Sequence, residues 1–95
     1  MNDADADFDS VGPVLSSCSL ADVLIDALRR RNVGLRVRHQ GAYVRALVPG
    51  RCKLLRADVE ELLGRPFEFP RDLEGVMPSF KGKLALTRDG AEWST

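Results

Sequence analysis

Residues 42–69, AYVRALVPGRCKLLRADVEELLGRPFEF, decide most of the fold, because a strand pattern gives way to a helix pattern within them. Apolar side chains alternate with the others over residues 43–48 and again over residues 51–55, which is typical of half-buried strands. Pro49 and Gly50 lie between the two runs and favour a turn. This arrangement predicts a β-hairpin.

The sequence period changes from two to about 3.6 residues at Arg56, which predicts a short helix. Val59, Leu62 and Leu63 share its apolar face. Three acidic side chains lie in its first turns, where the helix dipole favours anions: Asp58, Glu60 and Glu61. Gly64 is suited to the left-handed conformation that ends many helices, so we expect the helix to stop there.

The chain before this stretch predicts a strand and a longer helix. Residues 11–15, VGPVL, form a short apolar run in which Pro13 lacks the N–H for a ladder hydrogen bond. We therefore place this run at a sheet edge or a strand start. An S-x-x-D capping pattern begins at Ser19, ahead of an apolar stripe over residues 20–28. The arginines at 29–31 lie in the last turn, where cations complement the helix dipole, so we favour a solvated helix end over a binding patch.

Residues 35–39 alternate in the same way, and Gln40 and Gly41 after them favour a turn. Residues 35–55 therefore predict a three-stranded antiparallel meander. The C-terminal third predicts shorter elements: a helical turn at residues 71–74, a loop with an exposed aromatic at 79–82, and strands at 83–87 and 91–93 that pair as a hairpin. Trp93 is expected to cap the core. Together these elements predict an α+β fold.

Ninety-five residues are enough for one domain with one core, which we place at residues 11–95. Residues 1–10, MNDADADFDS, carry four aspartates and no lysine or arginine, so they predict a disordered acidic tail. Two roles for this tail remain open: it keeps the protein soluble, or it becomes ordered on a partner. The net charge of zero therefore hides a surplus of +4 on the rest of the chain. Eleven of the fourteen basic residues are arginines, which favours an acidic protein partner over DNA.

Several classes of function lack support in this sequence. Zero net charge gives no argument for a nucleic-acid or membrane partner, and no apolar run reaches the length of a transmembrane helix. A single histidine, His39, argues against a Cys/His zinc site, and no cofactor-binding motif is present. We therefore expect no metal and no cofactor. Cys18 and Cys52 fit a cytoplasmic chain whose thiols stay reduced.

A catalytic site would need polar groups that converge, and these residues offer few candidates. Asp58 and Glu61 lie three residues apart on one helical face, but the exposed first turn of a helix explains them. His39 has no serine, cysteine or second histidine to act with. The residues alone thus favour a small binding or regulatory domain over an enzyme.

The order of several motifs adds a resemblance to a known family. VGP at residues 11–13, AYVRA at 42–46, VEELLGRPF at 59–67 and the terminal hairpin together resemble the small effector proteins of bacterial multicomponent diiron monooxygenases. That family includes the regulatory component of soluble methane monooxygenase and the effectors of phenol hydroxylase and toluene monooxygenases. The likeness covers residues 11–94, and the motifs resemble the toluene or alkene monooxygenase branch most.

The resemblance implies a cofactorless protein in which two small antiparallel β-sheets pack with two main helices and a short helical turn. It also implies that the protein binds the large subunit of a diiron hydroxylase and reshapes its active-site pocket and access channel. Oxygen activation would thereby be coupled to substrate hydroxylation or epoxidation. A ferredoxin and a reductase would complete the system.

From the family's docking face we expect ten residues to contact the hydroxylase. They are Asp9, Ser10, Val11 and Gly12 ahead of and within the first strand, Arg38 and Gln40 in the hairpin, Arg65 after the acidic helix, and Ser79, Phe80 and Lys81 near the C-terminus. Arg65 has a second explanation, as a brace for the turn after its helix.

Two alternatives remain open. An adaptor domain would bind a protein or peptide by adding a strand to an exposed sheet edge. A small hydrolase that uses His39 would show activity from this chain alone.

Overall fold

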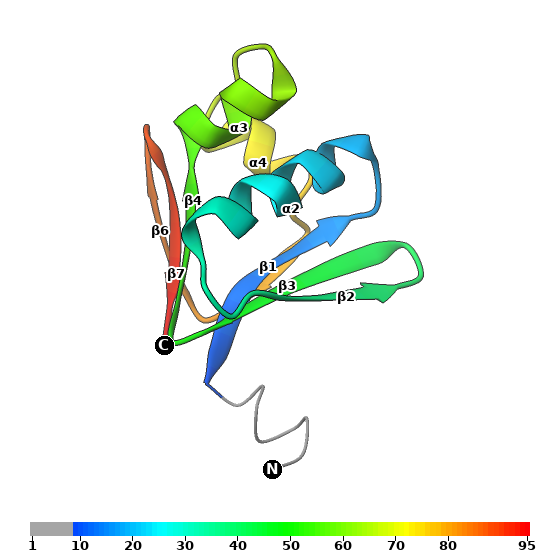
Figure 1. Ribbon diagram of the computed structural model, residues 1–95, viewed down its shortest axis with the longest axis vertical. Helices are drawn as coiled ribbons and strands as arrows, with labels where there is room; N and C mark the ends of the chain where they lie inside the picture. The colour runs from blue at the N-terminus through cyan, green and yellow to red at the C-terminus, as the bar shows by residue number, and fades with distance from the viewer. Residues whose placement is uncertain (1–8) are drawn as a thin grey trace.

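Two antiparallel β-sheets with helices packed against them make up the computed structural model, which describes residues 9–95 (Figure 1). The four-stranded sheet has the order β2 (Arg36–Gln40), β3 (Tyr43–Pro49), β1 (Ser10–Ser16) and β5 (Ser79–Lys81). The three-stranded sheet has the order β4 (Arg51–Leu55), β7 (Gly90–Ser94) and β6 (Lys83–Thr87). The helices are α2 (Ser19–Arg31), α3 (Arg56–Leu63) and the single turn α4 (Arg71–Glu74). The predicted α+β class, two sheets and three helical segments are confirmed.

The predicted meander over residues 35–55 is wrong in its last strand. β2 and β3 form the expected hairpin, but β4 leaves that sheet and pairs with β7, so that Cys52 lies opposite Trp93. The chain passes from one sheet to the other at Gly50, which has a φ of 77°. The Gly50 N–H donates a 2.7 Å hydrogen bond to the Asp9 carbonyl. Alternation predicts that a segment is extended, but it does not identify the strand with which it pairs.

The first strand is central rather than at an edge, contrary to the prediction from Pro13. β1 lies between β3 and β5 and already begins at Ser10, within the segment predicted as tail. The remainder of that predicted tail, residues 1–8, lies outside the described residues. The ladder with β3 pairs Val11 with Val48 and Val14 with Arg45, and it skips the two residues between. Proline is tolerated there because that part of the ladder does not use its missing N–H.

The core lies between the sheets and α2. Its largest fully buried side chains are Trp93, Phe67, Leu15, Leu24 and Leu28. Trp93, expected to cap this core, is thus completely enclosed within it.

The two main helices end as expected but begin and pack differently. Gly64 closes α3 in the left-handed region, and its N–H donates a 2.8 Å hydrogen bond to the Glu60 carbonyl. The cap predicted at Ser19 is wrong, because Cys18 precedes α2 and no side chain bonds to its first turn. On α3, Val59 is buried but Leu62 is 38% exposed, so the predicted apolar face is only partly used.

The segment predicted as a loop at residues 79–82 instead forms β5, which pairs with β1 at the edge of the four-stranded sheet. The helical turn at α4 and the C-terminal hairpin of β6 and β7 are confirmed. The tertiary position of β5 depends on β1, which lies more than sixty residues earlier in the chain.

Candidate docking surface

The four-stranded sheet has one face toward the core and one face that no described helix covers. α2 runs along the core side of this sheet, and the opposite side of the β2–β3 hairpin is open (Figure 1). Cross-strand partners in an antiparallel sheet point to the same side, so the register assigns side chains to each face. We call the second side the outer face; its residues are Gly12, Val14, Ser16, Arg36, Arg38, Gln40, Tyr43, Arg45, Leu47, Ser79 and Lys81. Gly12 and Leu47 are buried within it.

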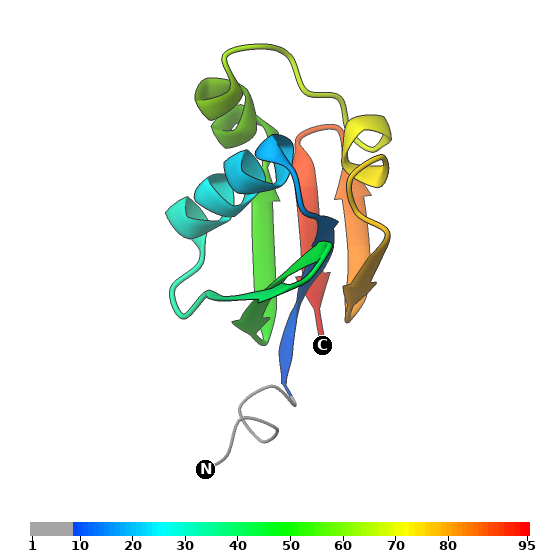
Figure 2. The same ribbon diagram turned by 90° about the vertical axis from the view of Figure 1, so that its right-hand side faces the viewer.

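One row of the outer face crosses all four strands. Arg38 of β2 lies opposite Arg45 of β3, Arg45 lies opposite Val14 of β1, and Val14 lies opposite Ser79 of β5. Segments more than sixty residues apart in the chain therefore meet in one sheet. Figure 2 views this sheet nearly along the β2–β3 hairpin.

Basic side chains dominate the outer face. It carries three arginines and one lysine, and none of its residues is acidic: Arg36, Arg38, Arg45 and Lys81. Arg38 and Arg45 are direct cross-strand partners, and like charges in that position destabilise a sheet. This concentration of positive charge suits an anionic partner.

A hollow of about 300 Å³ lies on this face. It is lined by Val14, Gln40, Tyr43, Arg45, Pro78 and Ser79. Tyr43 is 47% exposed, so its ring forms an accessible wall of the hollow. The Nε of Arg45 is buried and has no hydrogen-bond acceptor among residues 9–95.

The outer face brings together five of the ten residues predicted to contact a partner. They come from three strands: Gly12 from β1, Arg38 and Gln40 from β2, and Ser79 and Lys81 from β5. Of these, Gly12 is buried and offers no side chain to a partner. Gln40 and Ser79 line the hollow from opposite edges of the sheet.

The other predicted contacts are placed elsewhere. Ser10 is buried and Val11 belongs to the core, so neither offers its side chain to a partner in this conformation. Asp9 is exposed beside the Gly50 turn. Phe80 lies opposite Pro13 and therefore points to the other side of β5 from its neighbours, although 43% of its surface is exposed.

Arg65 is separated from the outer face. It lies in the loop after α3 and lines a second hollow, of about 390 Å³, together with Cys18, Phe67 and Arg71. The turn there is held by Glu60, whose carboxylate accepts a 2.9 Å hydrogen bond from the Phe67 N–H.

Tyr43, Arg45 and Arg36 belong to the outer face but were not among the predicted contacts. The alternating pattern already placed all three on the side away from the apolar residues. The pattern did not show which strands lie beside the hairpin. β1 and β5 complete the surface only in the folded chain.

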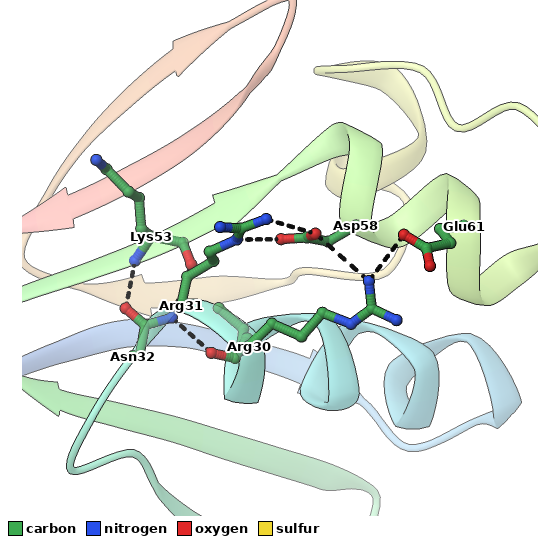
Figure 3. Close-up of polar contacts among 7 residues, drawn as sticks. Arg30, Arg31, Asn32, Lys53, Asp58 and Glu61 are labelled. Atoms are coloured by element: carbon green, nitrogen blue, oxygen red, sulfur yellow. Dashed lines mark hydrogen bonds and ion pairs between the residues drawn. The ribbon is translucent and has the colours of Figure 1, made fainter.

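The acidic helix and the arginines of α2 are joined to each other, contrary to the prediction that both face solvent. Arg31 donates from Nε to Asp58 Oδ2 at 2.7 Å, and Arg30 donates to Glu61 at 3.0 Å (Figure 3). Asp58 is only 4% exposed. The Arg31 hydrogen bonds hold the pKa of the Asp58 carboxyl below its usual value, although burial opposes this shift.

Asn32 extends this connection to β4. Its side-chain amide donates to the carbonyls of Leu28 and Lys53 at 2.8 and 2.7 Å, and its oxygen accepts the Lys53 N–H at 2.8 Å (Figure 3). These contacts fix α2, α3 and β4 relative to one another. We therefore interpret the cluster as a scaffold and not as a reactive site.

The described residues show no constellation suited to catalysis or metal binding. Residues 9–95 contain no group of three or more His, Cys, Asp or Glu side chains that could hold a metal ion. Cys18 and Cys52 are free thiols, and burial raises the pKa of Cys52 to about 12. His39 is exposed at the end of β2. Over the same residues, none of the helices has the length and apolarity needed to span a membrane.

Sequence comparison provides independent information on this chain. Residues 9–94 match the model of the MmoB/DmpM family. The chain is 38% identical, over 91 residues, to the effector subunit of the alkene monooxygenase system from Xanthobacter autotrophicus (strain ATCC BAA-1158 / Py2). That alignment covers 94% of this chain and 89% of the relative.

Structural comparison agrees with the sequence match. Two solved structures of a phenol hydroxylase–regulatory protein complex contain chains that superpose on this one with TM-scores of 0.83 and 0.78. Sequence identities are 22% and 23%, and 90% of this chain is covered together with 98% and 99% of theirs. At this identity the likeness establishes the fold, and the family match carries the relationship.

Proposed function

We propose that this chain, which belongs to the MmoB/DmpM family, acts by binding the diiron hydroxylase of a multicomponent monooxygenase. Its place in that family makes it a non-catalytic effector component, as the motifs predicted. The observation that carries the proposal is the family match over nearly the whole described chain. The alkene monooxygenase relative agrees with the branch that the motifs favoured.

The proposed site of action is the large subunit of the hydroxylase. Binding there would reshape the active-site pocket and its access channel and so couple oxygen activation to hydroxylation or epoxidation of a hydrocarbon. An effector can change turnover only if it binds one conformation of its partner more tightly than another. The outer face offers a preformed surface for this, because the ladders of the four-stranded sheet hold its strands in register.

The outer face is our candidate for that contact surface. Its positive charge and open position suit a hydroxylase surface rich in carboxylates. Five of the residues expected to contact the partner lie on it, and Phe80 adds an exposed aromatic at its β5 edge. A few such anchors can supply most of the affinity of a standard interface.

A ferredoxin and a reductase would deliver electrons to the same hydroxylase in the cytoplasm. The proposal is tested by reconstituting hydroxylase, ferredoxin and reductase with and without this chain. We expect both the rate and the fraction of reducing equivalents that reach product to rise and saturate as the chain is added. A product yield that does not respond to the chain would contradict the proposal and favour the adaptor alternative.

A further inference from the structure

The hollow on the outer face has features that the general charge of the surface does not explain. Arg45 lines the hollow and lies between Arg38 and Val14 in the row that crosses the sheet. Its Nε is buried and meets no acceptor in the described part of the chain. A buried donor that stays unpaired costs free energy, so the folded protein retains an unfavourable feature that a ligand would relieve.

The side chains around Arg45 define what fits. Gln40 and Ser79 add polar groups at either side, while Val14, Tyr43 and Pro78 form an apolar wall. An arginine binds a carboxylate through two parallel N–H···O hydrogen bonds, and the Nε of Arg45 supplies one of the two donors. At about 300 Å³ the hollow has room for one side chain and its immediate backbone.

We propose that this hollow receives an aspartate or glutamate side chain from an acidic segment of the hydroxylase, with Arg45 as its principal donor. The proposal rests on the function proposed above and names the chemistry of the partner at that surface. Charge complementarity supports this occupant, because the outer face carries four basic residues and no acidic one. Arg38, directly opposite Arg45, adds a second positive charge beside the bound carboxylate.

The test titrates the hydroxylase with the wild-type chain, with Arg45→Met and with Arg45→Lys, using stimulation of turnover and direct binding as readouts. Met keeps the aliphatic stem in the sheet without the charge, and Lys keeps the charge without the planar fork. We expect Arg45→Met to weaken binding about tenfold or more and Arg45→Lys to fall between it and wild type. The salt dependence of binding should be smaller for Arg45→Met, since one ion pair has been removed.

Arg88→Gln is the matched control. Arg88 is an exposed arginine in the turn between β6 and β7, and its replacement by Gln changes the net charge by the same amount as Arg45→Met. It should bind as tightly as wild type. Thermal unfolding of each variant shows whether a weaker interaction reflects loss of fold. Arg45→Met that folds and binds within about twofold of wild type overturns the proposal, while the proposed function stands if wild type still stimulates turnover.

Two other occupants give distinct results. If carboxylates of residues 1–8 filled the hollow, a full-length triple variant, Asp3→Asn, Asp5→Asn and Asp7→Asn, would bind the hydroxylase more tightly in an Arg45-dependent way. If a second copy of this chain filled it, wild type would self-associate and Arg45→Met would not. Either result overturns the assignment to the hydroxylase. A wild-type chain that neither binds nor stimulates the hydroxylase removes the proposed function and this inference together.

Discussion

Arg31 donates hydrogen bonds of 2.7 and 3.0 Å to the two carboxylate oxygens of Asp58, so that one guanidinium from the end of α2 holds both oxygens of a buried acid at the start of α3. The two residues are 27 positions apart in the chain. Because β4 joins directly to α3, this pair also fixes how the two sheets are connected through the helical layer. Arg30 adds a second link between these helices, to Glu61 at 3.0 Å, which lies at the surface.

Replacing Asp58 by Asn should destabilise the protein by about 1–3 kcal/mol, because the charged acceptor of two hydrogen bonds becomes a neutral amide in a buried position. Urea unfolding followed by circular dichroism measures the change. Glu61→Gln is the control, since Glu61 is 70% exposed and pairs with Arg30 at the surface. Its effect should be much smaller, because exposed ion pairs contribute little. Equal losses for the two variants would contradict the assignment.

The same pair predicts a pH dependence. Arg31 lowers the folded-state pKa of Asp58 below its value in the unfolded chain, which is about 4. The unfolded state therefore takes up a proton first, and the stabilisation is fully present above about pH 5 and lost progressively as the pH falls through 4 and below. The difference in stability between wild type and Asp58→Asn should be constant from about pH 5 to 7 and shrink by about pH 3.

Unfolding curves of both proteins measured at half-unit pH steps test this prediction. Using the difference between them cancels the contribution of other groups, notably Asp72, whose pKa is lowered mainly by the backbone N–H of Glu68. A difference that stays unchanged down to pH 3 would show that the charge on Asp58 is not what stabilises the contact.

Local elements of this fold follow from the sequence more reliably than their partners do. Gly64 ends α3 as predicted, because the left-handed conformation is a property of the glycine itself. The alternation of residues 51–55 correctly predicts a strand, but its pairing with β7 depends on contacts forty residues later. Pro13 shows the same limit, because the ladder that tolerates it is set by β3 and β5.

The candidate surface follows the same division. Alternation already placed Arg36, Arg38 and Arg45 on one side of the hairpin, so the basic character of the outer face was accessible from the sequence. The hollow was not, because Val14 and Ser79 line it from β1 and β5, the two strands that continue the sheet beyond the hairpin. The burial of Asp58 was also missed. The helix dipole favours an acidic residue in the first turn, so the local pattern held no reason to expect a buried ion pair there.

Gly12→Ala should destabilise the protein severely. Gly12 has φ 150°, and a Cβ atom there would lie 2.2 Å from the Ala46 carbonyl oxygen, a contact that only a backbone shift in β1 or β3 can relieve. Gly64→Ala is the matched control, because it also has positive φ but its Cβ would meet nothing within 4 Å. We expect about 1–2 kcal/mol from the strained backbone at Gly64 and clearly more at Gly12. Comparable midpoints for the two variants in thermal unfolding would argue against tight packing of β1 on β3.

Arg38→Ala and Phe80→Ala should each weaken hydroxylase binding by more than about 1 kcal/mol while leaving the fold intact, because arginine and aromatic side chains are frequent anchors of interfaces. The two residues occupy opposite edges of the four-stranded sheet and point to different sides of it. Losses for both would mean that the partner wraps around the β5 edge as well as covering the outer face. An unchanged titration curve for either variant removes that residue from the interface, and an unchanged curve for Arg38→Ala would also count against the outer face.

Arg65→Ala separates the two explanations of Arg65 in the same titration. If Arg65 braces the turn after α3, the substitution lowers the unfolding temperature. If Arg65 contacts the hydroxylase, the substitution lowers only the affinity.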